Sequence, residues 1–317
     1  MASRQAMSSL LGGPGVFLLF LALGCTAVAG TQLCTTESVD EATICSLVQS
    51  ISKEEVRIVF SGNHYPCQLT FAQYACIPRS WLQVWNKDFL TLLYPCLMAS
   101  GPPSALDPAY SILLFSKIDL PVLETALKKF SQQSSSQTVL SDQWAAVLFN
   151  GLWMRLGPAF QARETQATRS QLLSWLQPFL LHPVAFDCLT AQNTSCQTFH
   201  NLISALNDIY SSLEVEKQRK IFEGMESFLL QEDSGSHCQD EAVPGLNSSS
   251  WLANYLGFFL ERATIEELKR LVDEPKLQIL ARDPAALHLV SQLHLMPDLA
   301  RFYTTLLTSP PSLTSSA

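Results

Sequence analysis

The chain has 317 residues, a formal net charge of −8 and a hydrophobic content of 47%. This apolar content is sufficient for one large core or for an elongated array of helices. Charged residues make up only 15% of the chain, and lysines and arginines form no block. Nucleic-acid binding needs clustered basic side chains to neutralise phosphates, so the composition argues against a nucleic-acid partner.

The N-terminus has the pattern of an export signal. Arg4 supplies a short positive region, residues 16–23 form an apolar run, and Ala27 and Ala29 fit the small-x-small cleavage rule. We therefore predict a signal peptide over residues 1–29 and a secreted or extracellular protein. The alternative is a retained signal anchor, but the apolar run is shorter than the roughly 18 residues that a membrane span needs.

The chain contains nine cysteines, and one of them, Cys25, lies in the predicted signal peptide. The other eight are predicted to form disulfides, because their number is even and the chain is exported. These candidates fall into an N-terminal group of five and a later group of three: Cys34, Cys45, Cys67, Cys76 and Cys96, then Cys188, Cys196 and Cys238. If all eight pair within the chain, at least one bridge must join the two groups.

For the later group, we interpret Cys188 and Cys196 as partners across a small loop. Cys238 would then reach back to the N-terminal group. Because spacing alone does not define connectivity, the alternative of one free thiol in each group stays open.

After the signal peptide, residues 30–100 are predicted to form a cysteine-rich helical region. Ser52 and Glu55 have the spacing of a capping box, in which each side chain satisfies a free backbone amide of the other residue. A helix is therefore expected to begin after Ser52. Residues 67–78, which include Cys67 and Cys76, are interpreted as a disulfide-stapled loop.

Residues 101–308 are predicted to be a long series of helices joined by short turns. Helix starts are indicated at Asp107, Ser141 and Asp283. Both aspartates precede a proline, which fits the first helical position. The polar stretch at residues 231–245 is the candidate for an exposed linker. Residues 309–317 form a polar tail that is predicted to be disordered.

The stretch from residue 247 to residue 271 carries the strongest pattern. Residues 251–260 are predicted to form an apolar helix, with Leu252, Tyr255 and Phe259 on one face. A second helix begins at Thr264, which forms a capping box with Glu267. Because the turn between the two helices is very short, they are expected to pack antiparallel.

This stretch resembles a segment of the mesothelin family, to which stereocilin and otoancorin belong. The residues that carry the likeness are Asn247, Ser249, Trp251, Phe259, Leu260, Ala263, Thr264, Glu267, Leu268, Lys269 and Leu271. The resemblance implies a superhelix of short helices, an extracellular location, and roles in adhesion or matrix attachment. Relatives are often lipid-anchored, whereas the polar residues 309–317 lack the hydrophobic tail that a lipid-anchor signal requires.

The expected fold class is all-α, an irregular superhelical (armadillo-like) array of short helices with an N-terminal disulfide-rich region. The helix signals recur without one fixed period, so a strict repeat protein is not expected. A compact helical globule is the alternative architecture.

The sequence shows modification sites but no catalytic constellation. Asn193 and Asn247 each begin an Asn-x-Ser/Thr sequon, which predicts surface N-glycans in an exported chain. The chain has no Gly-x-Ser-x-Gly elbow, and His237 with Cys238 lacks a second ligand pair at metal-binding spacing. We therefore expect no metal, no cofactor and no enzymatic activity.

These observations lead to one favoured function and one alternative. The favoured function is a secreted or cell-surface-associated glycoprotein in cell adhesion or extracellular-matrix attachment. It would act through contacts with an extracellular protein or glycan, and any membrane association would be peripheral or through a partner. The alternative is a secreted helical carrier of an apolar ligand such as a lipid, without catalytic activity.

Overall fold

Helices and turns make up the described part of the chain in the computed structural model. The structure describes residues 39–60, 66–84, 89–134, 140–162, 169–190, 194–231, 238 and 251–308, and none of these residues forms a strand. The all-α prediction is therefore confirmed. Residues 34–317 form one compact unit, to which all the described residues belong.

The N-terminal part consists of short helices stapled by disulfides. Its elements are α2 (Glu41–Cys45), α3 (Lys53–Phe60), η1 (Pro66–Gln68), α4 (Phe71–Ala75), η2 (Arg79–Val84) and α5 (Phe89–Ala99). The predicted capping box at Ser52 is present, because Glu55 N donates to Ser52 Oγ and the Glu55 carboxylate accepts from Ser52 N. Residues 67–78 are more ordered than the predicted loop, since they contain α4 with its own capping box.

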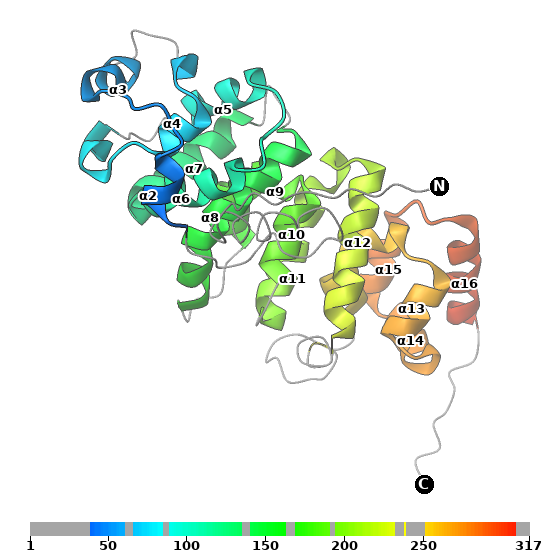
Figure 1. The fold of residues 1–317 in the computed structure, drawn as a ribbon. Helices are drawn as coiled ribbons and strands as arrows, with labels where there is room; N and C mark the ends of the chain where they lie inside the picture. The colour runs from blue at the N-terminus through cyan, green and yellow to red at the C-terminus, as the bar shows by residue number, and fades with distance from the viewer. Residues whose placement is uncertain are drawn as a thin grey trace, which may run out of the picture. The chain divides into compact units, whose positions relative to one another are not determined.

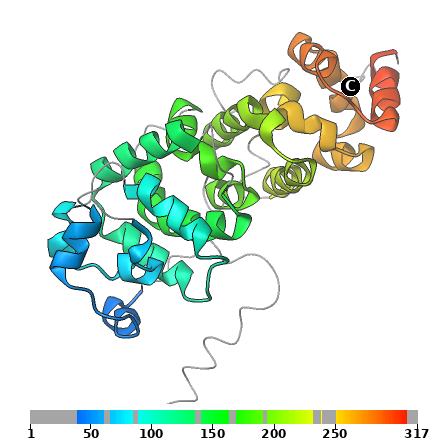
Figure 2. The same cartoon turned by 90° about the horizontal axis from the view of Figure 1, so that it is seen from above.

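Longer helices follow and form two rows (Figure 1). They are α6 (Asp107–Ser116), α7 (Leu120–Ser134), α8 (Asp142–Ala162), α9 (Arg169–Leu180), α10 (Pro183–Thr190), α11 (Cys196–Ile209), η3 (Tyr210–Ser212) and α12 (Val215–Leu230). From α4 to α12, each helix packs against the helix two further along the chain. One row therefore contains α4, α6, α8, α10 and α12, and the other contains α5, α7, α9 and α11 (Figure 2). This stacking is typical of helical arrays, and a superhelical rotation between the pairs stays a prediction.

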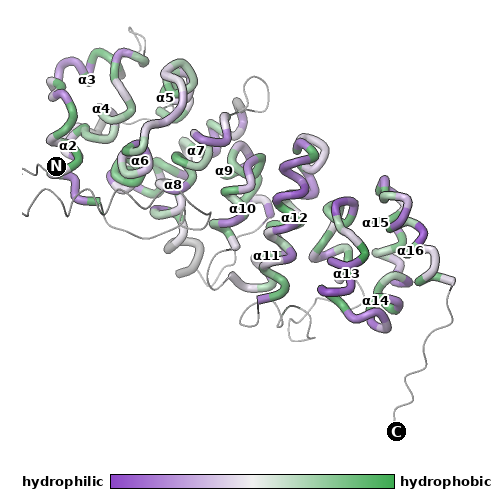
Figure 3. The backbone as a smooth tube through the Cα atoms, turned by 45° about the vertical axis from the view of Figure 1, so that its right-hand side comes forward, coloured by the Kyte–Doolittle hydropathy of each residue, from purple (hydrophilic) through white to green (hydrophobic). Residues whose placement is uncertain are grey.

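Buried side chains from Val56 to Leu306 form one continuous hydrophobic core. Its largest buried side chains are phenylalanines contributed by successive helices: Phe89, Phe115, Phe149, Phe179, Phe186, Phe199, Phe222, Phe228 and Phe259. Figure 3 shows hydrophobic and hydrophilic residues interleaved along α12. In the described part of the chain, no helix has the length and hydropathy required to cross a membrane.

The C-terminal part contains the elements that follow residue 250. They are η6 (Leu252–Leu256), η7 (Gly257–Arg262), α13 (Ile265–Leu271), α14 (Glu274–Ala281), α15 (Pro284–Ser291) and α16 (Pro297–Thr308). Two predicted caps are present here, since Asp283 Oδ1 accepts from Ala285 N at 2.9 Å and Thr264 forms its box with Glu267. At the equivalent Asp107, however, the helix already begins, and the carboxylate accepts from Ser104 N at 2.6 Å instead.

The prediction of one continuous apolar helix over residues 251–260 is wrong. The chain forms the π-helical turn η6, then turns sharply at Gly257, then continues as the 3-10 helix η7. Gly257 has φ 52° and ψ −140°, a conformation that is essentially restricted to glycine. The apolar residues are buried as expected, but a backbone break redirects them.

Three disulfides connect described residues. They join Cys45 to Cys76, Cys67 to Cys96, and Cys196 to Cys238. The predicted Cys188–Cys196 bridge is therefore wrong, and so is the predicted link from Cys238 to the N-terminal group. Cys196 begins α11, and this places it beside Cys238 rather than beside its sequence neighbour.

The remaining cysteines complete this picture. Cys188 on α10 is also disulfide-bonded, to a partner outside the described residues, and Cys34 lies outside them too. Cys238 is only 4% exposed, although it lies within the predicted exposed linker at residues 231–245. The bridge to α11 thus fixes one point of this stretch in the core.

Candidate functional site

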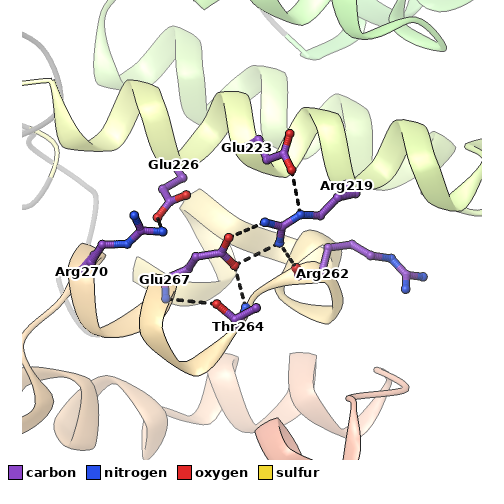
Figure 4. Close-up of polar contacts among 7 residues, drawn as sticks. All are labelled: Arg219, Glu223, Glu226, Arg262, Thr264, Glu267 and Arg270. Carbon is purple, nitrogen blue, oxygen red and sulfur yellow. Dashed lines mark hydrogen bonds and ion pairs between the residues drawn. The ribbon is translucent and has the colours of Figure 1, made fainter.

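A buried polar network lies where α12 meets η7 and α13. At its centre is Arg219 of α12, whose guanidinium donates to both carboxylate oxygens of Glu267 on α13, with Nη1 to Oε2 at 3.0 Å (Figure 4). Nη1 also donates to the carbonyl oxygen of Arg262 at 2.6 Å, and Nε donates to Glu223 Oε1 at 3.0 Å. One arginine therefore joins α12 to the end of η7 and to the start of α13.

Glu267 has two roles in this arrangement. Its Oε2 accepts from Thr264 N at 2.7 Å, and its own backbone N donates to Thr264 Oγ1 at 3.3 Å, which completes the capping box of α13. The residue is only 6% exposed. The Arg219 guanidinium, together with the Thr264 amide and hydroxyl, lowers the pKa of Glu267 from 4.5 to about 2. Paired, charge-assisted hydrogen bonds of this kind are among the strongest in proteins.

A second buried carboxylate, Glu261 of η7, links the network to the C-terminal helices. It accepts from the Tyr210 hydroxyl at 3.0 Å and from the backbone N of His294, in the segment before α16, at 2.7 Å. Burial, and after it the hydrogen bond to Glu261, raises the pKa of Tyr210. Glu261 therefore joins the end of α11 to residues far along the chain.

Gln218 of α12 supplies the neutral part of the network. Its amide nitrogen donates to the carbonyl oxygens of Tyr210 and Leu213 at 3.1 and 3.0 Å, and its amide oxygen accepts from Arg262 Nε at 2.8 Å. Glu226, two turns further along α12, forms an ion pair with Arg270 of α13 at 2.8 Å, and burial raises its pKa. Gln218, Arg219 and Glu226 of α12 thus contact η7 and α13.

The hydrogen bonds of this network hold α12, η7 and α13 together. Glu267 accepts from a guanidinium and a backbone amide, and Glu261 accepts from a phenol and a backbone amide, so each carboxylate joins separate elements of the chain. Among the described residues, no group of three or more histidine, cysteine, aspartate or glutamate side chains is arranged to hold a metal ion.

Sequence reasoning missed Asn207, which shapes the chain next to the network. Asn207 lies on α11, and its Oδ1 accepts from Phe258 N at 3.0 Å. A Cβ added at Gly257 would lie 2.3 Å from Asn207 Nδ2, so the amide group occupies the space that only a glycine leaves free. The one sequence signal was Gly257 itself, a glycine within an otherwise helical apolar run.

The predicted glycosylation sites lie elsewhere in the chain. Asn193 and Asn247 both fall outside the described residues. Thr264 and Glu267, by contrast, belong both to the predicted capping box and to the polar network. The segment that carries the family resemblance is therefore the one that the network attaches to α12.

A second candidate feature is a hollow of about 310 Å³ beside α6 and α8. Its lining residues are Val39, Ile112, Leu113, Ser116, Gly151, Met154 and Arg155. Gly151 lets the two helices approach closely here, since an added Cβ would lie only 2.3 Å from Ser111 Oγ. The lining is aliphatic apart from one hydroxyl and one guanidinium, so it is suited to a ligand that is apolar over most of its length.

The fold and these sites define an all-α, disulfide-bonded helical protein that joins its successive layers through buried polar contacts. Comparison with protein-family models, with curated proteins and with solved structures finds no match. The likeness of residues 247–271 to the mesothelin family therefore stays a prediction from the sequence.

Proposed function

We propose that the protein is a secreted or cell-surface-associated glycoprotein that acts in cell adhesion or extracellular-matrix attachment. The observation that carries the proposal is the set of three disulfides that cross-link the helices. Disulfides form and persist in oxidising compartments and are rare in the cytosol. The export signal over residues 1–29 and the sequons at Asn193 and Asn247 support the same location.

The proposed mode of action is binding to an extracellular protein or glycan. The buried charged groups of the polar network pair with one another, which favours a rigid scaffold over a catalytic centre. A stacked array of helices also presents a long surface to a partner. Adhesion and matrix attachment are the roles implied by the resemblance of residues 247–271 to the mesothelin family.

Expression of the full chain in mammalian cells tests the location, with separate assays of the medium and of the cell surface. We expect soluble protein in the medium that shifts to lower mass after glycosidase treatment. The double variant Asn193→Gln/Asn247→Gln should show no such shift, because both sequons are removed. Protein that stays inside the cell, with no shift, would contradict the proposal.

Binding assays then test the function. The purified protein is applied to immobilised matrix components and to cells, with a heat-unfolded sample as the control. The proposal predicts saturable binding that the unfolded sample lacks. Absence of binding to every matrix component and cell type would overturn the adhesion role while leaving the extracellular location intact.

The second candidate function is that of a secreted carrier of an apolar ligand. The hollow beside α6 and α8 favours it, because its lining is mainly aliphatic. Extraction of the natively purified protein with organic solvent, followed by mass spectrometry, tests this function. The carrier role predicts a lipid in stoichiometric amount, and an extract that matches a buffer blank would rule it out for the expression host used.

A further inference from the structure

The hollow beside α6 and α8 combines an aliphatic lining with one positively charged side chain, Arg155. Ile112 and Leu113 of α6, Met154 of α8 and Val39 form its apolar lining. A buried water molecule needs two to four hydrogen-bonding partners, and this mainly aliphatic lining offers few. An aliphatic chain is therefore the better occupant of most of the hollow.

Arg155 supplies the cation. Its Nε donates to the carbonyl oxygen of Ile118 at 3.3 Å, which orients the guanidinium at the lining of the hollow. No carboxylate of the described residues pairs with Arg155. The two terminal amino groups of this side chain are thus available to an external acceptor, in the forked geometry that matches a carboxylate.

The carboxylates closest in sequence to this lining are already used. Asp40, which follows Val39, accepts from Ala42 N at 3.3 Å and from the Thr43 hydroxyl at 2.5 Å. Glu41 pairs with Lys117 Nζ at 2.7 Å. Neither carboxylate is therefore the counter-ion of Arg155, and a bound anion would meet little competition from its own protein.

We propose that this hollow binds a fatty carboxylate of medium chain length, with the aliphatic chain against Ile112, Leu113 and Met154 and the carboxylate at Arg155. A volume of about 310 Å³ lies at the small end of ligand sites, which typically have 300–1,000 Å³. This size suits a medium-length chain better than a membrane phospholipid. The inference rests on the carrier function and is independent of the adhesion role.

Titration of the purified full-length protein with decanoate, followed by calorimetry, tests the site. All concentrations stay below those at which decanoate forms micelles. We expect saturable binding of one decanoate, and weaker binding of decanol, which lacks the charge that Arg155 would recognise. Equal binding of decanol and decanoate would overturn the role of Arg155.

Variants separate this hollow from adsorption elsewhere. Arg155→Gln should weaken decanoate binding by about tenfold or more, because a charge-assisted hydrogen bond is lost. Arg155→Lys, which keeps the charge, should restore part of the affinity. The matched control Arg57→Gln removes an exposed arginine that pairs with Glu54 on α3, and it should leave the affinity unchanged.

A blocking variant tests the hollow itself. Ser116 lines the hollow, is exposed, and bonds only to the carbonyl oxygen of Leu113 in its own helix at 2.8 Å, so Ser116→Phe should fill the space with little effect on folding. The control Ser174→Phe changes an exposed serine of α9 that has the same kind of bond, to Gln171. Loss of binding in Ser116→Phe alone supports the site, whereas equal binding in both variants overturns it.

The outcome is distinguishable from failure of the carrier function. If native extraction yields a stoichiometric lipid but Arg155→Gln and Ser116→Phe bind decanoate as the wild type does, the carrier function stands and this site is wrong. If neither lipid nor decanoate is bound, both are wrong.

Discussion

Asn207 and Gly257 fit together at the point where the C-terminal part of the chain changes direction. The Asn207 side chain accepts a hydrogen bond from Phe258 N at 3.0 Å and occupies the space beside the Gly257 Cα. Gly257 ends η6 and begins η7, so this contact sets the direction from which Arg262 and Glu267 reach Arg219 of α12. The backbone break and the polar network thus depend on the same contact.

Substitution of Gly257 should therefore be costly. In Gly257→Ala, the new Cβ meets the Asn207 amide and the positive φ is strained, so we expect the free energy of unfolding to fall by about 2 to 4 kcal/mol. Urea unfolding followed by circular dichroism measures it. Gly101 also has a positive φ, 85°, but has no atom within 4 Å of an added Cβ. Gly101→Ala should lose less, and equal losses would contradict a role for Asn207.

Removal of the charge on Glu267 should destabilise the contact between α12 and α13. Glu267→Gln removes the buried carboxylate partner of Arg219 and leaves only the exposed Glu223. Because Arg219 is itself 34% exposed, we expect a loss of about 1 to 3 kcal/mol, less than for a fully buried pair. The control is Glu223→Gln, which removes an exposed partner of the same arginine and should cost about 0.5 kcal/mol or less. Similar losses in the two variants would show that burial of Glu267 is not what stabilises the contact.

The pH dependence of the same pair follows from the lowered pKa of Glu267. Because the folded pKa of about 2 is below the ordinary 4.5, the folded state favours the charged carboxylate. This stabilisation is complete above about pH 4.5 and is lost as the pH falls toward 2. The difference in unfolding free energy between wild type and Glu267→Gln should therefore shrink over that range. A difference that stays constant from pH 5 to pH 2.5 would refute the assignment.

His182, in the turn between α9 and α10, should give a second pH dependence. It is 1% exposed, its Nδ1 lies 2.5 Å from Asp142 Oδ1, and its Nε2 has no hydrogen-bond partner among the described residues. Lys217 of α12 also pairs with Asp142 at 2.8 Å, and Glu214 lies near. Burial lowers the pKa of His182 below 6.5, although the Asp142 contact opposes the shift.

The fold disfavours the protonated form of His182, so this dependence has the same direction as that of Glu267 and the opposite direction to that of a histidine with a raised pKa. Since the unfolded chain binds the His182 proton more tightly, the free energy of unfolding should decrease as the pH falls below about 6.5. His182→Gln should flatten the change between pH 7 and pH 5, as measured by urea unfolding at each pH. The exposed His288 is the control, and His288→Gln should keep the wild-type slope. A steeper slope for His182→Gln would contradict the prediction.

The bridge between Cys196 and Cys238 should be both detectable and stabilising. Peptide mapping without reduction should yield a linked peptide pair that contains these two cysteines. The double variant Cys196→Ser/Cys238→Ser should lose about 4 kcal/mol, because the bridge closes a loop with a sequence separation of 42. A linked pair of Cys188 and Cys196 would restore the original sequence-based interpretation and contradict the structure.

The local features of the fold could be predicted from the sequence. The capping boxes at Ser52 and Thr264 and the cap at Asp283 are present, because each depends on atoms two or three residues apart. The all-α class follows from the same short-range periodicity of apolar residues. Glu267 was correctly placed in a capping box, but nothing near it in the sequence indicated Arg219.

Contacts between distant residues were decided only by the tertiary structure. Arg219 and Glu267 are separated by 48 positions, and Asn207 and Phe258 by 51. Cysteine pairing likewise depends on which helices become neighbours, so Cys196 bonds to Cys238 rather than to Cys188, eight residues away. Sequence periodicity determines which face of a helix is apolar, but the packing of all the helices together determines which polar groups meet across those faces.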